Sequence, residues 1–153
     1  MWSTVASAFK LSLRHLDYLH LLLFSSSTAF ITLWAILAFQ GRLSVLLTYS
    51  KRQYLYSAFL GFLNPFLYYI VLFKAYSLLP AQEALSLNYT WPLVLVLLST
   101  LILKQRLALE SLAALLVSFL GIIVIGTRGD LFSLGFSNPY GASLALCSSL
   151  IWA

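Results

Sequence analysis

The sequence contains little charge, few acidic side chains and almost no cysteine. Charged residues make up 8% of its 153 positions and only four are Asp or Glu, whereas soluble domains carry roughly 25% charged residues. Hydrophobic residues account for 61%, which argues against a water-soluble domain of this size. The single cysteine, Cys147, excludes an internal disulfide and a thiol cluster for a metal. Because it lies inside an apolar run, we expect it to pack against neighbouring helices.

The sequence also lacks a recognisable catalytic or metal-binding set. Two His, one Cys and four acidic residues, nearly all of the acidic ones in loops, supply no triad, no metal-ligand spacing and no phosphate-binding glycine loop. The nine Lys and Arg residues give a net charge of +5, but they are scattered through short connecting segments and form no basic patch. We therefore predict a protein that is not an enzyme and has no cofactor, metal or nucleic-acid partner.

Four long runs contain no Asp, Glu, Lys or Arg, and charged residues bracket each of them. They cover residues 18–41, 53–73, 84–103 and 111–127. A helix needs about 20 mostly apolar residues to span a bilayer. Only helices and closed barrels satisfy their backbone groups in hydrocarbon, and continuously apolar runs do not fit the alternating pattern of a barrel. The sequence therefore predicts an all-α, polytopic helical membrane protein whose surroundings are the lipid bilayer.

Two shorter apolar segments lie at the ends of the chain. Residues 2–13 are compatible with a helix but too short to span, and residues 131–153 form a further uncharged run with no basic flank. We expect partial helices in both places, which gives six helical segments joined by short loops. The chain is expected to be a fragment of a longer bundle.

The run at 53–73 carries polar and helix-breaking residues at bilayer depth. Asn64 and Pro65 fall near its middle, and helical spacing predicts one shared face for Ser57, Gly61, Asn64 and Tyr68. Such a face indicates contact with protein or water. Two interpretations stay open here: close packing against another helix, or a place on a substrate path.

The run at 84–103 carries a second set of this kind. Asn88, Trp91 and Pro92 share a face by i, i+3, i+4 spacing, with Tyr89 beside them, and Pro92 frees the carbonyl of Asn88. We expect the helix to bend there. An amide, an indole N–H and a free carbonyl on one face suit a cavity for a polar or aromatic small molecule, and the alternative is a packing kink. Two such sites at similar depth in consecutive spans favour the cavity.

Two basic side chains are candidate polar contacts for a substrate or a proton. Lys10 lies in the first partial helix, and His20 lies near the start of the run at 18–41. The alternatives are a lysine that reaches the membrane interface and a histidine that is simply hydrogen-bonded.

Two other features predict structural roles. Glu83 stands at the entrance of the run at 84–103, where a carboxylate stabilises the start of a helix. Ala114, Ser118 and Gly121 share one face of the run at 111–127, and small residues at this spacing predict tight helix contact.

Four short motifs resemble the EamA-type branch of the drug/metabolite transporter superfamily. They are AYSLLPAQEA at 75–84, NYTWP at 88–92, LKQRL at 103–107 and GIIVIG at 121–126. Gln105 stands where this family usually has an acidic residue. The motif at 88–92 is also similar to the aromatic amino acid exporter branch. The likeness covers nearly the whole chain.

The resemblance implies a bundle of ten helices built from two five-helix repeats of inverted topology, with substrate held between the halves. Residues 1–130 would be a first repeat that lacks the start of its first helix. Residues 131–153, which resemble the opening of a repeat, would be the truncated start of a second one.

The implied function is membrane transport, with export of small organic metabolites such as amino acids or drugs by alternating access. The implied location is a cell membrane, as in the bacterial inner membrane, and the implied partners are a small-molecule substrate and the missing second repeat or a second chain. The candidate substrate-path residues are Asn64, Tyr68, Asn88, Tyr89, Trp91 and Pro92. A different class stays open, namely a half-length membrane interaction or scaffold subunit that assembles with another chain.

Overall fold

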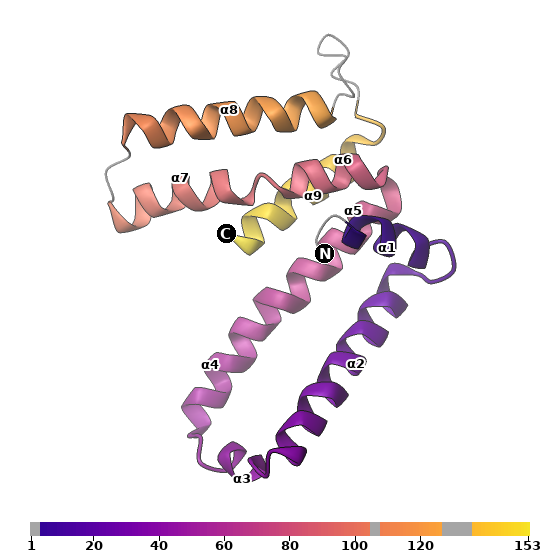
Figure 1. The fold of residues 1–153 in the computed structure, drawn as a ribbon, viewed down its shortest axis with the longest axis vertical. Coiled ribbons are helices and arrows are strands. Elements are labelled where there is room, and N and C mark those ends of the chain that lie inside the picture. Colours follow the sequence, from indigo (N-terminus) through magenta and orange to yellow (C-terminus); the bar gives the residue numbers. More distant parts are fainter. Residues whose placement is uncertain (1–3, 105–107, 127–135) are drawn as a thin grey trace.

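The computed structural model describes residues 4–104, 108–126 and 136–153, and every regular element within these ranges is a helix (Figure 1). The elements are α1 (Val5–Ser12), α2 (Tyr18–Phe39), α3 (Leu43–Leu46), α4 (Lys51–Gly61), the π-helical segment η2 (Phe62–Leu67), α5 (Tyr68–Leu78), α6 (Ala81–Asn88), α7 (Trp91–Leu103), α8 (Leu109–Gly126) and α9 (Pro139–Trp152). The predicted all-α class is therefore confirmed.

Three helical stretches are long and apolar enough to cross a membrane. They are Tyr18–Phe39, Lys51–Leu78 and Ala81–Leu103, and a shorter apolar helix covers Leu109–Val124. They correspond to the four predicted runs, except that the described apolar part of the last helix is shorter than a full span. Many of their large apolar side chains are exposed, as expected for surfaces that face lipid.

The second of these stretches is interrupted at Asn64, whose φ of −137° and ψ of 113° are not helical. The reason lies in the sequence, since Pro65 has no N–H to donate and its ring disfavours the α conformation of the residue before it. The predicted single face from Ser57 to Tyr68 is wrong, because an extended residue between them changes the helical register. Ser57 is exposed and Tyr68 is buried.

The third stretch is also interrupted, as predicted. Helix α6 ends at Asn88 and α7 begins at Trp91, with Tyr89 and Thr90 forming a turn between them. Pro92 occupies the first turn of α7, where a helix does not need its N–H. The next two amides, of residues 93 and 94, both donate to the Thr90 carbonyl, at 2.9 and 3.1 Å.

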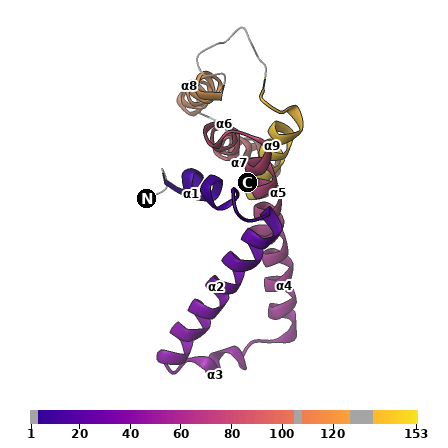
Figure 2. The same cartoon turned by 90° about the vertical axis from the view of Figure 1, so that its right-hand side faces the viewer.

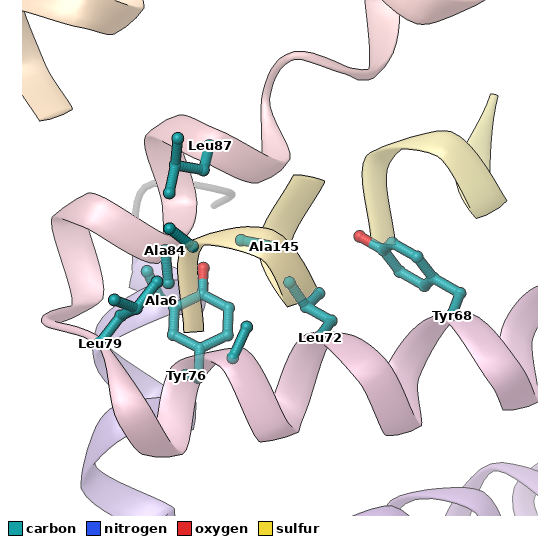
Figure 3. Close-up of a cluster of buried hydrophobic side chains, with 10 residues drawn as sticks. Ala6, Tyr68, Leu72, Tyr76, Leu79, Ala84, Leu87 and Ala145 are labelled. Carbon is teal, nitrogen blue, oxygen red and sulfur yellow. The ribbon is translucent and has the colours of Figure 1, made fainter. Parts of the chain in front are cut away.

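The core is built around α5, with α9, α6 and α1 packed against it. Figure 3 shows side chains of α5, including Leu72 and Tyr76, pointing toward Ala84 of α6 and Ala145 of α9. Tyr76 is only 1% exposed. By contrast, α2 touches α5 only near its first turns, and it splays away from α4 toward α3 (Figure 2). The splayed helices leave α5 as the centre of the fold.

Helix α9 approaches α5 closely at a glycine. A Cβ on Gly141 would lie 2.8 Å from Cγ of Leu79 and 3.0 Å from Cβ of Leu78. The same helix carries Cys147 on its exposed side, so the expectation that this thiol packs in the interior is wrong. It is wrong because the opposite face of α9 is the one that meets α5 and α6.

The small-residue face of α8 is likewise not a packing surface within the residues described here. Ala114, Ser118 and Gly121 are exposed, and a Cβ on Gly121 would meet nothing within 4 Å. The predicted tight contact is therefore wrong for the described residues, although α8 does contact α6.

The two glycines give a matched pair of variants. Gly141→Ala should lower the free energy of unfolding by about 1–2 kcal/mol, because overpacking costs more than the gain in helix propensity. Gly121→Ala should leave it unchanged or raise it by up to about 1 kcal/mol. Thermal denaturation of both variants in lipid nanodiscs measures this, and equal effects of the two substitutions would contradict the close contact of α9 with α5.

Candidate functional site

A cavity of about 400 Å³ lies where the break between α6 and α7 meets α1, α5 and the end of α9. Seven of its eleven lining residues are aromatic. The lining residues are Val5, Phe9, Tyr68, Tyr69, Leu72, Tyr76, Leu85, Asn88, Tyr89, Trp91 and Trp152. We call this space the aromatic cavity.

The aromatic cavity brings together four of the six predicted substrate-path residues. Tyr68, Asn88, Tyr89 and Trp91 all line it. Asn64 and Pro92 are not among its described lining residues. Pro92 instead starts α7, and Asn64 lies at the interruption of the preceding stretch.

The side chain of Asn88 joins three helices. Its Nδ2 donates to the hydroxyl oxygen of Tyr68 on α5 at 3.1 Å. Its Oδ1 lies 3.0 Å from the Ser148 hydroxyl on α9, which shares its one proton between this oxygen and the Ala145 carbonyl at 2.7 Å. Asn88 is only 6% exposed. A buried amide without partners would cost about 1–3 kcal/mol, so these bonds both satisfy the side chain and fix the end of α6.

A second polar contact lies two residues further on. The Thr90 hydroxyl is 2.8 Å from the Leu87 carbonyl and 2.9 Å from Oγ of Ser149, and either oxygen can accept its proton. Ser149 in turn donates to the Leu146 carbonyl of its own helix at 2.7 Å. Both sides of the α6–α7 break are therefore bonded to α9.

Aromatic rings from distant segments meet in the wall of the aromatic cavity. The Trp152 ring centroid lies 4.9 Å from that of Tyr68 and 6.3 Å from that of Trp91. Phe9 of α1 packs edge to face on Tyr76 at 5.7 Å. These separations are typical of favourable aromatic pairs. Trp152 was not among the predicted site residues, and its nearest signal in the sequence was the likeness of residues 131–153 to the opening of a repeat.

The two candidate basic contacts lie elsewhere. Nζ of Lys10 donates to the carbonyls of Tyr76 and Leu79 at 2.8 and 2.7 Å, which places its positive charge at the carboxyl end of α5. Lys10 is not a described lining residue of the aromatic cavity. His20 is exposed in the first turn of α2 and is likewise not a described lining residue of the aromatic cavity.

Glu83 has a second role beyond the predicted one at the start of α6. It lies in the first turn of α6, but its two carboxylate oxygens accept from the backbone N–H and the hydroxyl of Ser137, at 3.2 and 2.7 Å. The carboxylate, only 5% exposed, therefore ties the segment before α9 to α6. The predicted place at the start of its own helix is confirmed, and this long-range contact is additional.

A second cavity, of about 380 Å³, lies between α1, the first half of α2 and the interruption near Pro65. Its wall is mostly apolar, with Ser25, Ser26 and Tyr69 as hydroxyl-bearing members. Phe9 and Tyr69 line both this space and the aromatic cavity, so the two spaces are neighbours.

Comparison with known proteins identifies the class of this chain. Residues 1–127 match the model of the EamA-like transporter family, and the chain therefore belongs to that family. This confirms the resemblance to the drug/metabolite transporter superfamily. Its members are transporters of small molecules rather than enzymes, and the protein is a multi-pass membrane protein. No curated protein and no solved structure showed significant similarity to the chain.

The position of Lys10 predicts a stabilising role that a substrate contact would not show. Lys10→Met removes two charge-assisted hydrogen bonds at the end of α5 and should lower the free energy of unfolding by about 2 kcal/mol. Arg14→Gln, on the exposed side of the same segment, serves as the control and should have little effect. Unchanged thermal stability of Lys10→Met, together with an altered KM for transport, would instead assign Lys10 to the substrate.

Proposed function

We propose that this protein exports small organic molecules of aromatic character, such as aromatic amino acids or drugs, and that the aromatic cavity is its substrate site. The observation that carries the proposal is a ring-lined space beside a break in a membrane-spanning helix, with the amide of Asn88 at the break. Broken helices commonly flank the binding sites of secondary transporters. Family membership supplies the transport activity.

The residues divide into two roles in this proposal. Tyr89, Trp91 and Trp152 stack on the rings of the substrate, while the Tyr68 hydroxyl and the Asn88 amide provide hydrogen bonds at its polar end. Small-molecule sites commonly combine an apolar, aromatic wall with a few fixed polar groups. Substrates such as aromatic amino acids present both kinds of surface.

Asn64 and Pro92 do not line the aromatic cavity, and in this proposal they allow the conformational change that moves the substrate. Each stands at an interruption of a spanning stretch, where a few residues can absorb a change of backbone angle. We assign them to the conformational step of alternating access, in which the cavity opens to the two sides of the membrane in turn. During this conformational change the substrate would pass from the aromatic cavity into the neighbouring cavity near Pro65.

A second repeat, or a second chain, would complete the bundle. Residues 1–130 form the first of two inverted repeats in this proposal, and residues 131–153 begin the second. Support comes from the family match over residues 1–127 and from α9, which starts with its own Asn138 cap and packs on α5 and α6. The complete transporter would lie in a cell membrane, for which the bacterial inner membrane is the proposed location.

Substitution of one tryptophan tests the substrate site. Trp91→Ala should reduce the efflux of an aromatic solute about ten-fold, because losing a well-packed ring contact costs about 1.4 kcal/mol. Membrane insertion and protein level should stay near those of the wild type. Efflux from cells loaded with the labelled solute, normalised to the amount of membrane-inserted protein, is the measurement.

Trp34→Ala is the matched control, since Trp34 is a 53% exposed ring on α2 that lies in neither cavity wall. It should leave efflux unchanged. Equal losses from both substitutions would show that the effect is general and not a property of the aromatic cavity.

A further inference from the structure

The break between α6 and α7 combines residues that are bonded to α9 with residues that line the aromatic cavity. Asn88 and Thr90 are 6% and 5% exposed and are bonded to α9. Tyr89, between them, is 44% exposed and lines the aromatic cavity, as does Trp91. Two of these four consecutive residues are therefore bonded to α9 and three line the cavity, with Asn88 in both groups.

The anchors on α9 are two adjacent serines. Ser148 and Ser149 are 0% and 1% exposed, and the first holds Asn88 while the second contacts Thr90. Trp152 follows them by four and three positions, which places it on the same face of the helix. One face of α9 thus contacts both Asn88 and Thr90 and contributes the Trp152 ring to the aromatic cavity.

We propose that Ser149 is a positioning residue, which holds the α6–α7 break through Thr90 so that Tyr89 and Trp91 face the substrate. The inference rests on the proposed function, because it names the element that shapes the same site. The turn at Tyr89 and Thr90 lies outside regular helix, so side-chain bonds have more influence on its orientation than they would inside a helix. In apolar surroundings each such bond is hard to replace, since water does not compete for the hydroxyl.

The variants are chosen to remove one hydroxyl at a time. Thr90→Val and Ser149→Ala each delete one side of the same contact, and Thr90→Ser keeps the hydroxyl and should restore wild-type behaviour. Ser143→Ala is the control, because Ser143 is an exposed serine of α9 whose hydroxyl bonds only its own helix, at the Tyr140 carbonyl. All variants are made in the full-length protein in lipid nanodiscs.

The first measurement does not depend on any substrate. Backbone amide hydrogen exchange is followed by mass spectrometry in peptides that cover residues 86–92. Thr90→Val and Ser149→Ala should raise the exchange rate there about five-fold, the equivalent of one typical hydrogen bond. Exchange equal to that of Ser143→Ala would overturn the proposal.

The second measurement links the anchors to transport. The KM for an aromatic solute should rise about five-fold in each variant while the maximal rate per folded protein stays nearly constant, and the double variant should be no worse than the poorer single one. Additive effects, or a lower maximal rate at constant KM, would overturn the positioning role. If exchange rises as expected but the wild-type protein moves no aromatic solute, the proposed function fails while the anchoring of the break stands.

Discussion

The rest of the structure depends on the buried amide of Asn88 and its bonds to α5 and α9. A helix that is interrupted among apolar side chains must satisfy its polar groups within the protein, because hydrocarbon offers no partners. Asn88 meets this requirement with the hydroxyls of Tyr68 and Ser148. All buried side-chain nitrogen and oxygen atoms in the described ranges have a partner. The bonds that stabilise the break therefore also hold α5, α6 and α9 together around the aromatic cavity.

The aromatic cavity is a consequence of this arrangement. Helix α9 can reach Asn88 only because Gly141 lets it lie directly on the end of α5, and this approach brings Trp152 onto Tyr68. Lys10 fixes α1 to the same end of α5 through two carbonyls. The wall of the cavity is thus assembled from segments far apart in the sequence, held by a small number of polar contacts at its edge.

The sequence predicts the membrane-spanning helices and the bend just before Pro92 because both follow from local rules. A charge-free run of sufficient length must be helical in a bilayer, and a proline cannot continue the preceding turn. The same rules failed for the face from Ser57 to Tyr68, since one extended residue at Asn64 shifts the register. The roles of Ser148 and Trp152 were beyond prediction, because they depend on contacts across about 60 residues of sequence that no local pattern encodes.

The most direct test of this account is to map where an aromatic solute binds. An aromatic amino acid that carries a diazirine is photo-crosslinked to the protein in lipid nanodiscs, and the labelled peptides are sequenced. The account predicts adducts in residues 68–76, in residues 85–91 and at Trp152, all suppressed by excess unlabelled solute. Adducts confined to the exposed part of α2, or labelling that excess solute does not reduce, would contradict it.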